Sequence, residues 1–450
     1  MSWRSSERVA VAQLAGNKAD SLWCSVGILI LLMSVVVILI PNVPPLQDFN
    51  EWAYQGFLVK ESVFGRPIPA AFKHWPVPSA IFQLIFALMT AVFTPIFAAR
   101  FFACAYICLS GLAMWKAAEQ ADQAGRGSRF LLLIALVIVH APFWAGEIDY
   151  QVGLVILIWY VGRYRLKPAP GLLTDVGFSL LLFVCHALCL GMFLVYVGWR
   201  ELARLNIGRI IVTALPALIL CAWFVSADPF HDQKPGDPLA AGPQLVGLFQ
   251  QVAYRFYFLA KAGPYQNLVF NNFGDYDRLK SAYLIGIAIN VFFSGSMALY
   301  LVAWVLNSIK KKVFSPELLT SVTFALIAVI NPGRTLGIGN AGERFVYPAL
   351  AIAVLSFSPP LLLRRLVLGF GSCLAIFLAY QIWVLPRSKP LPDNADWHQA
   401  DQPETRPRLI FWHRPFLYYE QLAAAESSAR SGIPPTADIV FESSILQKKR

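Results

Sequence analysis

The amino-acid sequence predicts an all-α polytopic membrane protein, and three observations lead to that prediction. Of its 450 residues, 57% are hydrophobic and only 14% are charged, whereas a soluble domain is nearer half apolar and a quarter charged. The mean hydropathy is +0.56. Apolar stretches recur as far as residue 385, and they correspond to about nine to eleven membrane segments. A cytosolic enzyme, a disordered protein and a single-pass receptor are therefore excluded.

The N-terminal segment, residues 1–22, is polar with a basic excess, and the apolar run Trp23–Ile40 follows it. This run is long enough to span a bilayer, and no small-residue cleavage site follows it. We therefore interpret it as a signal anchor with the N-terminus in the cytoplasm. The membrane module then covers residues 23–385, and residues 386–450 form a polar tail.

Six short segments carry nearly all of the positive charge. They are the N-terminus and residues 116–129, 163–175, 199–209, 309–317 and 361–365. Together they hold 17 Lys and Arg against 7 Asp and Glu, whereas the rest of the chain holds 20 against 19. Because Lys and Arg in short loops mark the cytoplasmic side, we place all six segments there. Membrane topology thus explains the net charge of +11, and no nucleic-acid partner is needed.

Placing all six segments on one side constrains two other parts of the chain. Residues 77–94 and 98–115 must together make one net crossing, and the Thr94-Pro95 break allows one of them to be re-entrant or interfacial. Residues 172–198 must form a broken hairpin around His186. Non-helical backbone at membrane depth is tolerated where it lines a cavity, although a satisfied buried histidine is the simpler interpretation of His186.

The remaining polar segments then fall on the outer side of the membrane. They are loop 42–76, turn 146–150, loop 228–281, turn 331–344 and the tail. Within the tail, the pattern predicts a short amphipathic helix at Tyr418–Arg430 and an extended segment at Ala437–Ile445. All seven cysteines lie in apolar stretches, which indicates helix contacts and neither a disulfide framework nor a metal site.

The first outer loop contains Asp48 and Glu51, which share a face if the segment is helical. A carboxylate there can act as a general base toward an acceptor or hold a divalent ion against a phosphate. The simpler alternative is a solvated helix start with Asp48 as the N-cap. A second acidic pair, Glu147 and Asp149, lies between two apolar runs on the same predicted side. It either belongs to the same site or forms an exposed turn.

Three basic residues of the outer segments are candidates for phosphate binding. Arg344 follows a turn with four glycines, a pattern that suits an anion site, and a guanidinium can hold phosphate bidentately. Alternatively, Arg344 pairs with Glu343 or reaches lipid headgroups. Lys73 and His74 are the other two candidates. The sequence contains no Walker A, GxSxG, HExxH or GxGxxG motif, so ATP-driven transport and nucleotide-sugar chemistry receive no support.

These residues resemble the GT-C superfamily of integral-membrane glycosyltransferases, which includes protein O-mannosyltransferases and lipid A aminoarabinose transferases. Pro44-Pro45-Leu46-Gln47-Asp48 is similar to the family's loop motif after the first span. Lys73-His74-Trp75-Pro76-Val77-Pro78 is similar to its H/K-P-P-L run, and Glu147 or Asp149 falls where its second acid lies. The similarity covers about residues 20–200, and it implies a GT-C-like helical bundle.

The resemblance implies an inverting transfer from a polyprenyl-phosphate sugar to a lipid, glycan or protein acceptor. Asp48 would be the base or orient the acceptor, and Glu147 or Asp149 would orient the acceptor or a metal. Lys73, His74 and Arg344 would hold the donor phosphate. Here Asp48 is followed by Phe-Asn-Glu51 and not directly by another acid, so whether Glu51 replaces the usual neighbour stays open. This departure argues against metal dependence; if a divalent metal ion is present, Asp48 and Asp149 would be its ligands.

Two other functions stay open at this stage. A transporter or flippase of lipid-linked or small solutes would need charges at mid-membrane depth and related halves. A polysaccharide polymerase or ligase would need a large outer loop with several arginines and a histidine, and loop 228–281 offers Arg255, Arg278 and His231. The absence of outer cysteines and of Asn-x-Ser/Thr sites suits a bacterial inner membrane.

Overall fold

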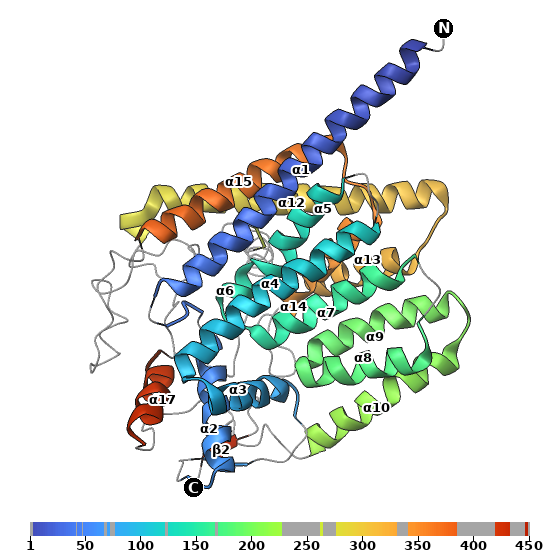
Figure 1. Ribbon diagram of the computed structural model, residues 1–450. Coiled ribbons are helices and arrows are strands. Elements are labelled where there is room, and N and C mark those ends of the chain that lie inside the picture. The colour runs from blue at the N-terminus through green and yellow to red at the C-terminus, as the bar shows by residue number, and fades with distance from the viewer. Residues whose placement is uncertain are drawn as a thin grey trace.

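Five helices of the computed structural model are long and apolar enough to cross a membrane, so the protein is an all-α membrane protein. They are α1 (Trp3–Leu39), α4 (Pro95–Ala121), α10 (Ile207–Ser226), α12 (Tyr276–Lys311) and α15 (Leu361–Val384). In Figure 1 the long helix α1 crosses the bundle beside α15. The structure describes residues 3–41, 43–46, 48–66, 70–72, 77–121, 125–166, 170–226, 262–263, 276–330, 341–384, 419–432 and 446–448.

The long helices turn large apolar side chains outward. Leu32 of α1, Leu109 of α4, Leu299 of α12 and Ile376 of α15 are all more than half exposed. A soluble protein rarely leaves so many large apolar side chains in contact with water. On these helices, lipid acyl chains would be their natural surroundings.

Other apolar segments are surrounded by protein. α5 (Arg126–Leu133) runs into a π-helical turn, η1 (Ile134–Ile138), and then into the single-turn helix α6 (Ala141–Trp144). Residues 130–139 are almost wholly buried, as are most residues of α7 (Ile148–Tyr164) and α14 (Ala341–Ser356). A helix that is apolar all round belongs in such an interior. This explains why the described chain has fewer long spans than the nine to eleven segments predicted from hydropathy.

The segment after α1 contains two short helices, α2 (Phe49–Val63) and α3 (Ala80–Val92), packed against each other. Gly56 of α2 makes this contact possible, because an added Cβ would lie 2.2 Å from the Phe86 Cβ. With 13 residues, α3 is about 20 Å long, too short for a hydrocarbon core of about 30 Å. The long partner is α4, which agrees with the prediction that this pair makes one crossing.

Residues 172–202 form the broken hairpin that the charge distribution predicts. α8 (Leu172–Cys185) and α9 (Ala187–Leu202) pack side by side, and His186 alone separates them (Figure 1). Asp175, near the start of α8, binds Arg200, near the end of α9, at 2.6 Å. The two ends of the hairpin therefore lie at the same end of the bundle, and His186 lies at its apex.

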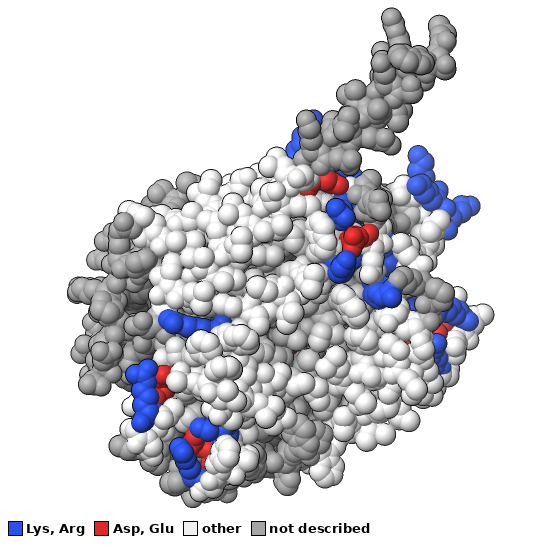
Figure 2. Space-filling model, in the orientation of Figure 1, with Lys and Arg blue, Asp and Glu red and all other residues white. Residues whose placement is uncertain are grey.

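The basic segments gather at one end, which we call the basic end. The Asp20 carboxylate accepts from the Gly125 N–H at 3.2 Å, and the Trp23 indole donates to the Arg364 carbonyl at 3.1 Å. Arg165 donates to the Ala121 carbonyl at 2.7 Å. Figure 2 shows charged side chains toward opposite ends of the visible face, with a broad white region between them. The grouping agrees with the sequence prediction.

The described segments that the sequence predicts to be on the outer side gather at the opposite end, which we call the acidic end. The tail helix α17 (Tyr419–Ser431) packs on α2, and its Glu426 accepts from the Ile96 N–H at 3.0 Å. The strand β2 (Leu446–Lys448) pairs antiparallel with β1 (Ala70–Phe72). The predicted tail helix is thus present one residue from its expected bounds, whereas Ala437–Ile445 lies outside the described residues.

α13 (Pro316–Ile330) completes the bundle against α14 and α9.

All seven cysteines are unpaired, as the sequence predicts. Cys185 and Cys189 are buried at the contact of the α8–α9 hairpin with α7, where an added Cβ on Gly153 would lie 2.8 Å from the Cys189 sulfur. They are therefore helix-contact residues.

The buried Asp175 should be a main stabilising group of the basic end. Its carboxylate binds Arg200 and Arg209, each at 2.6 Å, and accepts from the Tyr160 hydroxyl. Because removal of one partner leaves buried charges uncompensated, we expect Asp175→Asn to lower the free energy of unfolding by about 3–5 kcal/mol. Denaturant unfolding in detergent measures this loss. Glu119→Gln, which breaks an exposed ion pair with Lys116, should leave stability unchanged, and an equal loss in both variants would contradict the assignment.

Candidate functional site

The first outer loop packs directly on the turn before α7. The Asp48 N–H donates to the Ala145 carbonyl at 2.9 Å. Gly146 has a φ of +79°, and an added Cβ would lie 2.4 Å from the Phe49 nitrogen and 2.6 Å from that of Asp48. Only glycine tolerates both the left-handed backbone and this close approach. The two acidic segments predicted from the sequence are therefore neighbours.

Asp149 lies in the first turn of α7 and is only 8% exposed. Its Oδ2 accepts a 2.8 Å hydrogen bond from the hydroxyl of Ser79, the residue just before α3. Ser79 is itself buried and has a φ of +66°, a strained backbone for a residue with a Cβ. Such strain is often found at functional sites. Asp149 is thus a fixed, buried carboxylate and not part of an exposed turn.

His186 reaches this site from the break between α8 and α9. Its backbone is extended, with φ −166° and ψ 124°, and its Nδ1 accepts from the Leu188 N–H at 3.1 Å as the cap of α9. A neutral histidine with Nδ1 as acceptor carries its proton on Nε2. That Nε2 lies 3.8 Å from the Asp149 carboxylate. The prediction of a satisfied buried histidine holds for Nδ1, whereas Nε2 faces the site.

Arg344 approaches from the first turn of α14. One guanidinium nitrogen, Nη2, binds Glu147 at 2.9 Å, and the other, Nη1, lies 3.3 Å from the His186 Nε2. The side chain lies over the Tyr150 ring at 5.5 Å, and the Tyr150 hydroxyl donates to the Arg344 carbonyl at 2.6 Å. The ion pair with Glu147 replaces both simple alternatives, a pair with Glu343 and a reach to lipid headgroups.

The N–H groups of the His186 ring and of the Arg344 guanidinium therefore lie next to each other. The tautomer deduced above makes the His186 Nε2 a donor, and the Arg344 Nη1 is always a donor. The two donors are 3.3 Å apart, and the Asp149 and Glu147 carboxylates lie beside them. The arrangement suits a bound carboxylate, phosphate or sulfate oxygen.

Every residue of this site stands at the beginning of a helix. Asp48, Ser79, Glu147 and His186 directly precede α2, α3, α7 and α9, and Arg344 is in the first turn of α14. Each helix N-terminus carries about half a positive charge. These five termini favour an anion at the site, whereas the C-terminus of α8 and the carboxylates of Asp48, Glu147 and Asp149 oppose part of that field.

The remaining sequence-predicted residues have separate positions. Glu51 accepts from the Gln55 amide at 2.8 Å, and Gln83 donates to the Gln55 carbonyl oxygen at 2.8 Å, so Glu51 belongs to a polar chain between α2 and α3. Asp48 is half-buried, and its side chain makes no capping hydrogen bond to α2. Asp48 is therefore the N-cap residue of α2, as the simpler alternative predicts, although its carboxylate does not make the capping hydrogen bond. Lys73 and His74 lie outside the described residues.

A metal ion was left open by the sequence, with Asp48 and Asp149 as its ligands. Within the described part of the chain, no three His, Cys, Asp or Glu side chains come together at metal-binding spacing. Asp149 accepts from the Ser79 hydroxyl, and Glu147 pairs with Arg344.

Sequence analysis missed a second buried polar chain next to the site. The Tyr106 hydroxyl donates to the Gln151 carbonyl oxygen at 2.8 Å, and the Gln151 amide lies 2.9 Å from the Nε2 of His140, which packs against the Tyr347 ring. The π-helical turn just before His140 is an irregularity that recurs at functional sites. One signal was visible in the sequence, a His-Ala-Pro break inside an apolar run.

Searches of protein-family models, of curated proteins and of solved structures find no match to this chain.

Proposed function

We propose that the protein is a membrane glycosyltransferase of GT-C type that transfers a sugar from a polyprenyl-phosphate donor. The observation that carries this proposal is the convergence of the Arg344 and His186 N–H groups beside Asp149, at the junction of five helix N-termini. Donors aimed at one point, in a positive field, stabilise the charge that develops on a leaving phosphate.

In the proposed reaction, the acceptor hydroxyl or amine approaches the acidic end near Asp48. The Asp48 carboxylate takes the acceptor proton, and the acceptor atom forms a bond to the anomeric carbon. The bond from that carbon to the phosphate oxygen breaks, and its electron pair stays on polyprenyl phosphate. Direct displacement of this kind inverts the anomeric carbon. Asp149, held by Ser79, orients the acceptor, and Arg344 and His186 bind the phosphate.

The membrane location supports a lipid-linked donor. The site lies at one end of a bundle whose long helices turn apolar side chains outward, so a polyprenyl chain can stay in the hydrocarbon while its phosphate reaches the site. We place the acidic end on the outer side of a bacterial inner membrane and the basic end in the cytoplasm, because the six basic segments lie together. Lys73 and His74 remain additional candidates for the phosphate.

The buried charged groups do not favour a transporter. Arg129, Asp175 and Arg200 are buried at the basic end, where Arg129 donates to the Ser358 hydroxyl and the other two pair with each other. Asp149 and Glu343 are buried at the acidic end. A transport path would need such groups at mid-membrane depth.

Neutralising Asp48 should lower the rate of sugar transfer without changing the affinity for the donor. Loss of a general base typically costs about 10²–10⁴ in rate, so we expect Asp48→Asn to lose transfer activity by at least about 10²-fold with donor affinity retained. The measurement is binding and transfer with a panel of radiolabelled polyprenyl-phosphate sugars. Glu119→Gln at the basic end is the control and should match the wild type. Full activity in Asp48→Asn, or no binding of any panel member to the wild type, would overturn the proposal.

The Arg344 guanidinium should determine donor affinity. Because Arg344→Gln alone leaves Glu147 without its partner, the informative variant is the double change Glu147→Gln with Arg344→Gln. We expect its donor Kd to rise about tenfold to a hundredfold, the equivalent of one charge-assisted hydrogen bond. The single change Glu147→Gln keeps the guanidinium and should bind the donor as tightly as the wild type. Equal loss in both variants would assign the effect to the ion pair and contradict phosphate binding by Arg344.

The orientation can be tested with two single cysteines in a cysteine-free background. Phe64 lies at the acidic end and is 65% exposed, and Leu205 lies at the basic end and is 90% exposed. A membrane-impermeant maleimide should label Phe64→Cys in intact cells and Leu205→Cys only after the membrane is opened. The reverse pattern would place the candidate site in the cytoplasm.

A further inference from the structure

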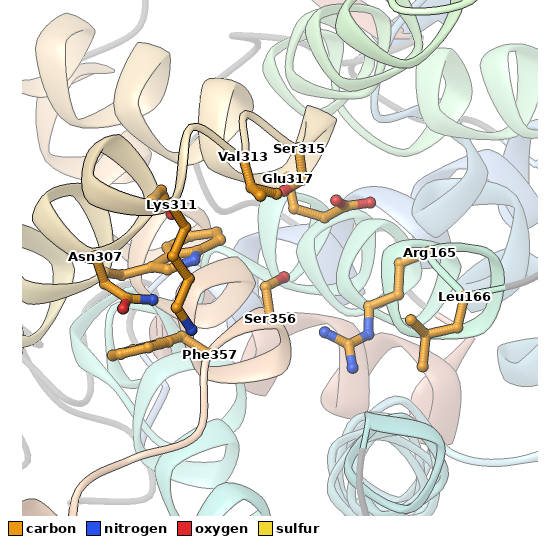
Figure 3. A pocket seen from close by; sticks show the side chains of 11 residues that line it. Arg165, Leu166, Asn307, Lys311, Val313, Ser315, Glu317, Ser356 and Phe357 are labelled. Carbon is orange, nitrogen blue, oxygen red and sulfur yellow. The ribbon is translucent and has the colours of Figure 1, made fainter.

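A pocket of about 320 Å³ lies at the basic end, far from the candidate site. It is bordered by the residue after α7, the last turns of α12, the first turn of α13 and the end of α14. Figure 3 shows the Lys311 ammonium and the Arg165 guanidinium reaching into it from opposite sides, with the Ser356 hydroxyl between them. Its volume is at the lower end of the range for small-ligand sites.

The pocket collects positive charge. Among the described residues, Lys311 has neither an ion pair nor a hydrogen bond, although Lys116 and Lys60 each bind a carboxylate. The N-terminus of α13 adds a partial positive charge. Arg129 donates to the Val354 carbonyl and Arg364 donates to the Pro359 carbonyl, so both arginines lie near the end of α14. The C-termini of α7, α12 and α14 offset part of this field, although the Val354 carbonyl of α14 accepts from Arg129.

The one carboxylate of the lining does not cancel this charge. Glu317 is 9% exposed and accepts from the Tyr196 hydroxyl at 3.2 Å, and in Figure 3 it lies across the pocket from the Lys311 ammonium. The Ser356 hydroxyl is buried and makes no hydrogen bond within the described chain. A buried hydroxyl between two cations is a further donor for an anionic oxygen.

The rim of the pocket is apolar and faces outward. Leu166, Val313 and Phe314 are each more than half exposed, and so are Leu306 and Ile309 on the last turns of α12. α12 is one of the candidate membrane spans. The acyl chain of a lipid can therefore lie along α12 while the headgroup enters the pocket. A soluble anion would not require this apolar rim.

We propose that this pocket binds the phosphate headgroup of an anionic phospholipid. Lys311 and Arg165 hold the phosphate, and Ser356 donates to it. The acyl chains lie against Leu306 and Ile309. Basic pockets between membrane helices bind anionic headgroups by this chemistry. The site is independent of the proposed glycosyltransferase activity, because its residues lie at the opposite end of the bundle.

The test compares three variants that each remove one positive charge from the same turn. Lys311 lines the pocket, whereas Lys310 and Lys312 do not. Native mass spectrometry of the detergent-solubilised protein, titrated with phosphatidylglycerol, measures the affinity. We expect Lys311→Gln to weaken binding about tenfold, the effect of one charge-assisted hydrogen bond, and Lys311→Arg to retain most of it. Lys310→Gln and Lys312→Gln should stay within about twofold of the wild type.

Two further arms identify the ligand. Phosphatidylcholine should bind much more weakly than phosphatidylglycerol, and glycerol 3-phosphate, which has the phosphate but no acyl chains, should compete poorly. Equal weakening in all three glutamine variants would mean a diffuse surface attraction and overturn the pocket. Glycerol 3-phosphate competing as well as the lipid would overturn the lipid assignment in favour of a soluble anion.

Discussion

The arrangement of the candidate site depends on the buried ion cluster around Asp175. A carboxylate with no exposed surface is stable in an apolar bundle only if its charge is matched. Arg200 from α9 and Arg209 from α10 match it, and the Tyr160 hydroxyl adds α7. These contacts fix the open end of the α8–α9 hairpin beside α7. His186 at the apex is thereby held at the other end of α7, beside Asp149.

Two helices, α7 and α14, connect the candidate site with the pocket at the basic end. α7 begins with Asp149 at the candidate site, and Arg165 of the basic pocket follows its last turn. α14 begins near Arg344 and ends at Ser356. Both helices are buried and run from the acidic end to the basic end, so their positive N-termini face the site and their negative C-termini face the cluster of lysines and arginines. The helix dipoles of α7 and α14 therefore interact favourably with the lysines and arginines at the basic end, and their N-termini favour negative charge at the acidic end.

Much of this arrangement was predictable from charge and hydropathy. The grouping of the basic segments, the hairpin at residues 172–198 and the single crossing by α4 all follow from confining Lys and Arg to one side. The interior helices were not predictable, because hydropathy measures apolarity and does not distinguish lipid from protein as the neighbour. The run at residues 130–145 reads as a span, yet it is broken by a π-helical turn and buried.

The candidate site was predictable only in part, and for a related reason. Acidic residues between apolar runs are costly in a membrane, so Asp48, Glu147 and Asp149 stand out in the sequence. Ser79 does not stand out, because its role depends on a left-handed backbone that places its hydroxyl 2.8 Å from Asp149. His186 was noticed, but its contact with Arg344 spans 158 residues of sequence and follows only from the folded hairpin.

The proposed donor, a polyprenyl-phosphate sugar, changes its charge during the transfer, and the helix termini of the acidic end bear on that change. Glu147 and Asp149 lie beside the Arg344 guanidinium, which is therefore the positive side chain nearest to them. A polyprenyl-phosphate sugar has one negative charge in the ground state and gains a second as the bond to the anomeric carbon breaks. The positive ends of five helices and the N–H groups of His186 and Arg344 interact more strongly with that second charge than with the first alone. If the proposed function is right, this difference favours the transition state over the bound donor, which is the condition for catalysis.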